Sequence, residues 1–252
     1  MSMKYNAFLY DFDNRPFLKE EVRFYRRFVK EHNIRTYLEY GVGTGRIFSV
    51  LAPKCEYAVG VDLSNEMLKV CREKVKHLSN CELIYGDFLN YRSDRVFDLL
   101  AIPFNSFHHI LTKKDQIKFL RTVKKSMGDK SLFMLDTVNY SVAQPLIGTV
   151  NEWKLDYTCN KKELQVVRTQ MLTRRNYKMK TLEKIFKYEI FKQGIRIKEE
   201  SFVAKMKFSE YSDIEALLKK VGLEIVKVFS KYEDNESVDG RKAIYLIKKK
   251  HV

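Results

Sequence analysis

The segment of the sequence with the clearest chemical meaning joins an acidic residue to alternate glycines, Glu39-Tyr-Gly41-Val-Gly43-Thr-Gly45. Glycines at every second position let a backbone turn tightly and pass close to a ligand before a helix starts. The fingerprint for a pyrophosphate is spaced GxGxxG, and the carboxylate of Glu39 would repel that group. The segment therefore favours a ligand that carries an ammonium group.

A second carboxylate follows at the end of the next predicted strand. Asp62 ends Val59-Gly-Val-Asp62 and lies 17 residues past Gly45. A carboxylate at this position can accept hydrogen bonds from both hydroxyls of a ribose. S-adenosylmethionine has both a methionine ammonium and a ribose, so it satisfies Glu39 and Asp62 together.

These features resemble the class I S-adenosylmethionine-dependent methyltransferases. The resemblance covers about residues 35–136 and continues through Leu63 and Met67, then Gly86-Asp87-Phe88, then the segment that ends at Pro103. It implies that Glu39 and the glycines line the methionine part and that Asp62 holds the ribose. It also implies that Asp87 meets the adenine amino group beside Phe88, with Leu63, Met67 and Pro103 completing the cofactor site.

The N-terminal segment Tyr10-Asp-Phe-Asp-Asn-Arg15 is a candidate lid. In the resembling family this part of the chain often closes the cofactor pocket, which would place Tyr10 or Arg15 over the cofactor. An aromatic packing residue and a surface arginine are the alternative interpretation of the two positions.

The reaction is expected past the carboxyl end of the fourth strand, at Pro103-Phe-Asn105-Ser-Phe-His108-His109. Methyl transfer from a sulfonium is an in-line displacement that depends on positioning, with a base needed only where the acceptor must lose a proton. An imidazole, His108 or His109, could accept that proton, and Asn105 could orient the acceptor. The alternative is that both histidines only pack and form local hydrogen bonds. The Asn-Pro-Pro-Tyr pattern of enzymes that methylate the amines of bases is absent.

The hydrophobic pattern predicts an α/β fold: a Rossmann-like, seven-stranded, mostly parallel sheet with helices on both faces. Strands are expected over 35–39, 57–62, 82–85, 97–102, 132–136, 224–231 and 243–249. Helices are expected over 17–32, 44–52, 65–78 and 113–127, with a last helix that Ser212 caps and that ends at Gly222.

Residues 151–208 break this alternation with long strand-like runs and a Gln193-Gly194 turn. They are predicted to form an antiparallel β insertion that covers the acceptor site, while 1–150 and 209–252 form the cofactor-binding domain. The insertion carries 15 Lys and Arg against 7 Asp and Glu, more than half of the net charge of +15.

Composition narrows the remaining possibilities. The four cysteines, Cys55, Cys71, Cys81 and Cys159, show no paired spacing, so neither a metal site nor a disulfide framework is expected. No apolar run reaches the roughly 20 residues that cross a bilayer, and no signal peptide is evident, which predicts a cytoplasmic protein without a membrane partner.

Three functions are consistent with the sequence. The first is a methyltransferase that acts on the nitrogen or oxygen of a small molecule. The second is an RNA methyltransferase that contacts phosphates through the insertion, using Tyr157, Arg168, Arg174, Arg175, Tyr177, Lys178 and Lys180. The third is a non-catalytic protein that binds the cofactor or serves as a scaffold. Acceptor identity and oligomeric state depend on surface shape, which residue spacing does not encode.

Overall fold

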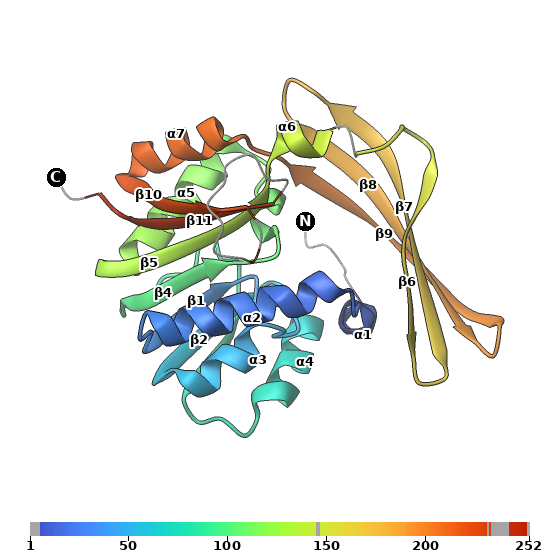
Figure 1. Ribbon diagram of the computed structural model, residues 1–252, viewed down its shortest axis with the longest axis horizontal. Helices are drawn as coiled ribbons and strands as arrows, with labels where there is room; N and C mark the ends of the chain where they lie inside the picture. Colours follow the sequence, from blue (N-terminus) through green and yellow to red (C-terminus); the bar gives the residue numbers. More distant parts are fainter. Residues whose placement is uncertain (1–5, 145–146, 231, 233–241, 251–252) are drawn as a thin grey trace.

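The computed structural model describes residues 6–144, 147–230, 232 and 242–250. A seven-stranded sheet forms its centre in the order β10-β11-β5-β4-β1-β2-β3 (Figure 1). The pairs from β5 to β3 are parallel, whereas β11 runs antiparallel to both β5 and β10. The predicted Rossmann-like sheet is therefore confirmed. Its strands are β1 Thr36–Tyr40, β2 Tyr57–Asp62, β3 Cys81–Tyr85, β4 Phe97–Ile102, β5 Met127–Val138, β10 Leu223–Phe229 and β11 Lys242–Lys249.

Helices cover both faces of this sheet because alternate strand residues point to opposite sides. Leu38 and Tyr40 of β1 pack into a core with α5 and α7, whereas Tyr37 packs into a core with α2, α3 and α4. The helices are α1 Ala7–Phe12, α2 Pro16–Glu31, α3 Phe48–Leu51, α4 Asn65–Val75, α5 Lys113–Lys125, α6 Tyr140–Ala143 and α7 Tyr211–Val221, with short 3-10 turns at Ala52–Lys54 (η1) and Ser106–His109 (η2).

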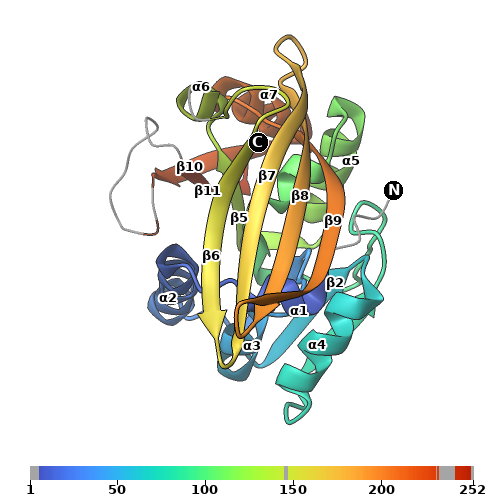
Figure 2. The same cartoon turned by 90° about the vertical axis from the view of Figure 1, so that its right-hand side faces the viewer.

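A separate four-stranded antiparallel sheet stands beside the first, in the order β6-β7-β8-β9 (Figure 2). Its strands are β6 Trp153–Lys161, β7 Leu164–Asn176, β8 Thr181–Lys192 and β9 Ile195–Lys207. Leu9 and Phe12 of α1 pack against its apolar residues, and β9 contacts η2. The second sheet thus meets the first at the loop that follows β4.

Three elements differ from the sequence prediction in ways that have a clear physical cause, and the ends of the other predicted helices and strands shift by at most three residues. The helix expected over 44–52 is only α3, since Gly43 and Gly45 hold a left-handed backbone and Pro53 stands in the 3-10 turn that follows. The cap of α7 is Glu210 and not Ser212, because Glu210 and Asp213 form a reciprocal capping box. Strand β5 starts at Met127 and extends to Val138, beyond the predicted 132–136.

A buried ion pair joins α2 to the loop that precedes α3. Glu21 is fully buried and contacts the guanidinium of Arg46, whose side chain is only 20% exposed. The hydroxyl of Tyr232 lies 2.8 Å from Oε1 of Glu21. A buried charge that loses its partner is costly, so this contact constrains how α2 sits on the sheet.

Replacing Glu21 should therefore destabilise the fold strongly. In Glu21→Gln the Arg46 charge stays largely buried without a carboxylate, and we expect the free energy of unfolding to fall by about 3 kcal/mol. Urea denaturation measures the change. The matched control is Glu31→Gln, which removes the exposed Arg27–Glu31 pair on the same helix and should cost less than about 1 kcal/mol. Equal losses in the two variants would contradict the role given to the buried pair.

Candidate functional site

The candidate site lies where β1, β2 and β4 end. Strand β1 pairs with β2 on one side and with β4 on the other, so the chain order reverses at β1. Ligands of open α/β sheets bind at such a reversal, outside the carboxyl ends of the strands. The predicted loops after Tyr40, Asp62 and Ile102 all reach this edge.

The glycine loop needs its glycines for two reasons. Gly41, Gly43 and Gly45 have φ angles of 70°, 56° and 78°, in the left-handed region that other residues rarely adopt. A Cβ on Gly45 would also lie 2.4 Å from Sγ of Cys71, and one on Gly41 would lie 3.2 Å from Oγ of Ser106. The loop therefore follows the end of β1 closely and leaves its backbone open to a ligand.

Asp62 ties this loop to the end of β2. Its carboxylate accepts hydrogen bonds from the backbone N–H of Gly43 and of Ser64, each at 2.8 Å. Burial raises the pKa of Asp62, while the backbone donors act in the opposite direction. Each oxygen keeps a further lone pair, so the carboxylate can still accept from a ligand hydroxyl.

Glu39 provides a second carboxylate near the carboxyl end of β1. It is 2% exposed, and the hydroxyl of Tyr37 donates to its Oε2 at 2.8 Å. Burial raises the pKa of Glu39 to about 8. A ligand cation at this carboxylate would favour the ionised form, as the sequence prediction requires.

The turn after β3 places Asp87 and Phe88 near the glycine loop. Asp87 accepts from the backbone N–H of Leu89 at 2.9 Å and from the side-chain amide of Asn90 at 3.2 Å. The half-buried ring of Phe88 lies beside Gly41, where a Cβ would come within 4.0 Å of it. The adenine contacts predicted for these residues remain a prediction.

The other residues assigned to the cofactor lie at the same edge. Leu63 is 40% exposed, whereas Met67 is buried and its backbone N–H donates to Oγ of Ser64 at 3.3 Å. Pro103 is buried at the end of β4, and its carbonyl accepts from the hydroxyl of Ser106 at 2.9 Å. Leu63 therefore offers a free apolar surface, and Met67 contributes mainly to the start of α4.

The turn after β4 has an unusual backbone. Phe104 and Asn105 have φ angles of 52° and 60°. Asn adopts this left-handed region readily, whereas a bulky residue such as Phe104 occurs there only where the surrounding structure imposes it. The backbone N–H of Phe104 donates to Asp136 at 3.0 Å, and its ring stacks on Phe17 and meets Tyr10 edge-on. Strand β5 therefore holds the backbone of this turn through Asp136, while Tyr10 and Phe17 pack on the ring of Phe104.

A buried charge network under this turn was not anticipated from the sequence. Asp136 is fully buried, with Oδ2 lying 2.8 Å from Nζ of Lys242 and 3.3 Å from the hydroxyl of Tyr232. Tyr232 in turn reaches Glu21, the partner of Arg46. Burial raises the pKa of Asp136 to about 7. The sequence does contain one signal for this network: a predicted strand ends at the acidic residue Asp136, as two other predicted strands end at Glu39 and Asp62.

His108 is held inside the protein. It is 3% exposed, its Nε2 lies 2.6 Å from Oγ1 of Thr137 and accepts from the backbone N–H of Val138 at 3.2 Å, and its ring packs on Phe208. Burial lowers its pKa to about 3. This geometry favours the packing alternative for His108, and its role as a proton acceptor stays an untested prediction.

His109 and Asn105 lie nearer to the surface. Nδ1 of His109 is 3.3 Å from the carbonyl of Lys205 in β9, and burial lowers the pKa of its ring. Oδ1 of Asn105 lies 3.5 Å from Nζ of Lys242. His109 therefore links the turn after β4 to the second sheet, and Asn105 stands beside the buried network.

The predicted lid residues have different surroundings. Tyr10 is half-buried against Phe104, and burial raises its pKa to about 12. Arg15 pairs with Asp13 at 2.6 Å and with Asp156 of β6 at 3.5 Å, and it lies over the ring of Tyr157. Tyr10 thus reaches the turn after β4, whereas Arg15 fixes the N-terminal segment to the second sheet.

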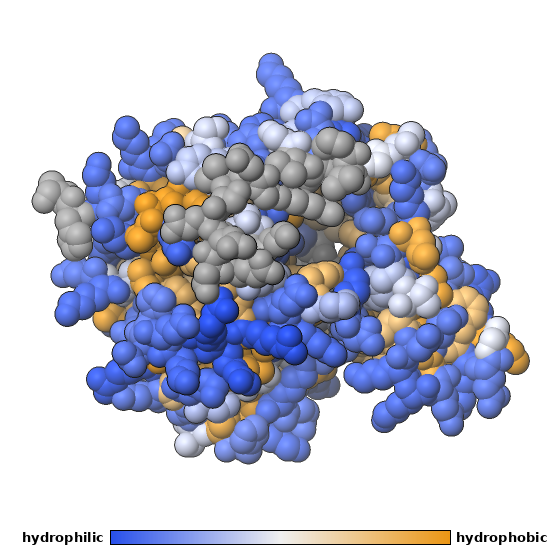
Figure 3. All heavy atoms as spheres, viewed as in Figure 1, coloured by the Kyte–Doolittle hydropathy of each residue, from blue (hydrophilic) through white to orange (hydrophobic). Residues whose placement is uncertain are grey.

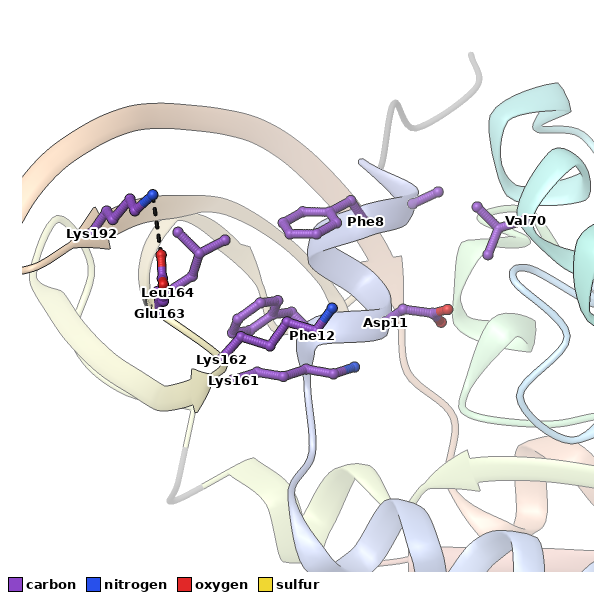
Figure 4. Close-up of a pocket in the computed structure, with 10 residues that line it drawn as sticks. Phe8, Asp11, Phe12, Val70, Lys161, Lys162, Glu163, Leu164 and Lys192 are labelled. Atoms are coloured by element: carbon purple, nitrogen blue, oxygen red, sulfur yellow. Dashed lines mark ion pairs between the residues drawn. The ribbon is translucent and has the colours of Figure 1, made fainter.

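Helix α1 closes over the glycine loop. Asp11 accepts a hydrogen bond from the hydroxyl of Thr44 and pairs with Lys74 of α4. Its other side borders a cavity of about 680 Å³ between α1, α4 and the ends of the second sheet (Figure 4). The residues that line this cavity are Ala7, Phe8, Asp11, Phe12, Val70, Lys161, Lys162, Glu163, Leu164 and Lys192.

Several basic side chains of the insertion form ion pairs or stack on aromatic rings within the protein. Arg168 pairs with Asp156 and packs against Tyr157, which is buried, and Lys180 lies 2.5 Å from Asp213. Arg175 stacks on Tyr177. Among the predicted phosphate contacts, Arg174, Tyr177 and Lys178 are exposed. The set therefore does not form one continuous basic surface.

The described residues contain no group of three His, Cys, Asp or Glu side chains that could hold a metal ion, and their four cysteines are free thiols. Within the same ranges, no helix is long and apolar enough to cross a membrane.

Comparison with known proteins agrees with this geometry. Residues 38–129 match the family model described as a methyltransferase domain. An uncharacterized methyltransferase of Staphylococcus carnosus is 33% identical over 104 residues, which are 40% of this chain and 46% of the relative. The chain spans less than half the length of this relative and of three other curated relatives that it matches, one of them an uncharacterized RNA methyltransferase of Clostridium tetani.

Two solved structures share the whole fold. An S-adenosylmethionine-dependent methyltransferase from Clostridium acetobutylicum superposes with a TM-score of 0.81 at 22% identity, over 98% of this chain and 99% of that one. The sugar N-methyltransferase KedS8 from a Streptoalloteichus species gives a TM-score of 0.76 at 16% identity, over 100% of this chain and 95% of that one.

The burial of His108 has a consequence for stability at low pH. An unfolded histidine binds a proton below about pH 6.5, whereas folded His108 does so only near pH 3, so stability is lost as pH falls through this range. Between pH 7.5 and 4.5 we expect the wild type to lose about 2 to 3 kcal/mol more unfolding free energy than His108→Gln. Urea denaturation at the two pH values tests this. Identical pH dependence in both proteins would show that His108 is not held neutral.

Proposed function

We propose that this chain is a class I S-adenosylmethionine-dependent methyltransferase and that it transfers a methyl group to a nitrogen or oxygen atom of a small molecule. The observation that carries the proposal is the pair of carboxylates at the ends of neighbouring strands. Glu39 and Asp62 face the same edge, and the glycine loop between them is bonded directly to Asp62. A ligand with an ammonium group and a ribose fits this arrangement.

The polar groups at this edge support S-adenosylmethionine as the cofactor. Glu39 would hold the methionine ammonium, with Gly41, Gly43 and Gly45 against the same part of the ligand, and Asp62 would accept from the ribose hydroxyls. Asp87 and Phe88 would hold the adenine, Leu63 and Pro103 would add apolar contact, and Tyr10 would close the site. The bound cofactor supplies an electrophilic methyl group on its sulfonium.

The acceptor would lie between the turn after β4 and the second sheet. Residues 1–150 and 209–252 would then form the cofactor-binding domain, and 151–208 would cover the acceptor. Asn105 is suited to orient a polar group of the acceptor, because it lies in the constrained turn beside Lys242. An amine bound in its neutral form needs no catalytic base for the transfer, so the reaction would depend on positioning.

The nature of the acceptor is inferred from the enclosure and from one neighbour. Helix α1 and the turn after β4 both contact the second sheet beside this edge, which favours a small molecule over a polymer. The shared fold with a sugar N-methyltransferase supports an amine on a small polar molecule. RNA methylation through the insertion has less support, because Arg168 and Lys180 are paired within the protein.

Cofactor binding should depend on Asp62. In Asp62→Ala the ligand loses a charge-assisted acceptor and the glycine loop loses its anchor, so we expect S-adenosylmethionine to bind about 100-fold more weakly. Calorimetric titration with S-adenosylmethionine and S-adenosylhomocysteine measures both affinities. Asp94→Ala, which removes an exposed acid with the same change in net charge, is the control and should bind as the wild type does.

Formation of S-adenosylhomocysteine from supplied amines then tests catalysis. A wild-type protein that binds neither compound would falsify the proposed cofactor. Binding without turnover on any amine or hydroxyl acceptor would instead favour the non-catalytic alternative.

Glu39 should make cofactor binding dependent on pH. The ligand ammonium requires the ionised carboxylate, whereas burial keeps Glu39 protonated below about pH 8 in the ligand-free protein. Affinity should therefore rise by about tenfold for each pH unit between 5.5 and 7.5, where the α-amino group stays charged. Calorimetry of Glu39→Gln provides the comparison, since that variant should bind weakly with little pH dependence. A wild-type profile as flat as that of the variant would remove Glu39 from the ammonium site.

A further inference from the structure

A second concave surface lies on α2, away from the candidate site. Its cavity measures about 1010 Å³ and contains six basic side chains: Arg23, Arg26, Arg27, Lys30, Arg35 and Lys54. All six are exposed, and buried Val29 and Ile34 lie between them. We call this surface, with Asn33 and Glu56, the α2 groove. The space-filling view shows the strongly hydrophilic residues gathered over α2 (Figure 3).

The α2 side of the groove places like charges next to one another. Arg23, Arg26, Arg27 and Lys30 are spaced three and four residues apart, so they form one stripe along the helix. Neighbouring cations at these spacings repel and destabilise a helix, which exposed helices usually avoid by alternating charge. An anionic ligand along the stripe would relieve this repulsion.

In the part of the chain that the structure describes, the acids that contact the groove are fewer than its cations. Glu56, the one acid among its lining residues, is bound by Arg35 through two hydrogen bonds of 2.6 and 2.8 Å. Glu31 lies 3.9 Å from Arg27 at the end of α2. Asp98 also accepts a hydrogen bond from the backbone N–H of Arg35 at 2.9 Å. Among the described residues, six basic side chains thus face three carboxylates, which leaves the groove an excess of positive charge.

The position of the groove separates it from the chemistry of the candidate site. Arg35 precedes β1, and Lys54 and Glu56 precede β2, so these residues lie at the amino ends of the strands. The glycine loop, Asp62 and the turn after β4 lie at the carboxyl ends. A ligand in the α2 groove would therefore leave the cofactor and acceptor accessible.

We propose that the α2 groove binds the phosphodiester backbone of a nucleic acid. Four of the six cations are arginines, whose planar guanidinium groups match phosphate oxygens. The stripe from Arg23 to Lys30 is roughly 10 Å long at the rise of an α-helix, which exceeds a single phosphate and suits consecutive ones. None of the described residues that line the groove is aromatic, so these residues offer no platform for base stacking and would contact the backbone without sequence preference.

The test is the salt dependence of oligonucleotide binding. Fluorescence anisotropy with labelled 20-nucleotide single-stranded RNA and DNA of one sequence gives the slope of log K against log salt concentration. The groove variant combines Arg23→Gln, Arg26→Gln and Lys30→Gln. Each lost phosphate contact changes the slope by about 0.7, so the magnitude should fall by about 2 for both polymers.

A matched variant separates the groove from the overall charge. Lys114→Gln, Arg121→Gln and Lys125→Gln remove the same charge from exposed positions on α5, and this protein should keep the wild-type slope. Both variants should still bind S-adenosylmethionine as the wild type does, which confirms folding, because their changes lie outside the cofactor site.

Three outcomes would overturn the proposal: no binding of either oligonucleotide by the wild type, an equal loss in the two variants, or a slope that the groove variant leaves unchanged. A fourth outcome would show that the groove binds a membrane surface and not a nucleic acid. In that case the groove variant would no longer sediment with phosphatidylserine vesicles but would still bind the oligonucleotides.

Discussion

The buried contact between Arg46 and Glu21 is the interaction on which the shape of this edge depends. It joins the glycine loop to α2, and Tyr232 and Asp136 extend it to Lys242 at the start of β11. Charges withdrawn from water are stable only when each finds partners, so the loop, the helix and the two strands must take positions that satisfy all of them together. These contacts therefore fix the relative positions of the glycine loop, α2, β5 and β11.

The strained turn after β4 depends on the same network. Phe104 keeps its left-handed backbone because its N–H donates to Asp136 and its ring lies under the Arg46 guanidinium. A bulky residue in this conformation costs free energy that the surrounding contacts must offset. The strain has a structural result: it turns Asn105 toward Lys242 at the edge where the acceptor would bind.

Features that depend on residues close together in the sequence, such as buried strands, were predicted well. Strands β2 and β4 match the predicted ranges, because apolar runs ending at an acid or a turn define a buried parallel strand. The same reasoning located Glu39 and Asp62 at one edge. It could not find the pairing of Asp136 with Lys242, which are far apart in the chain, nor that His108 is enclosed by β5 and Phe208. Residue type indicates what a histidine can do, whereas burial determines what it does.

Counting charges along the sequence points to the insertion, but it does not show how the cations are arranged in space. The insertion holds more than half of the net charge, yet Arg168 and Lys180 are engaged with carboxylates and the insertion cations alternate between two strand faces. In α2 the helical repeat gathers fewer cations onto one side, and the chain before β1 and β2 adds two more across the groove. Because potential depends on how closely like charges are confined, four cations on one side of a helix concentrate their charge more than cations spread over the two faces of a sheet.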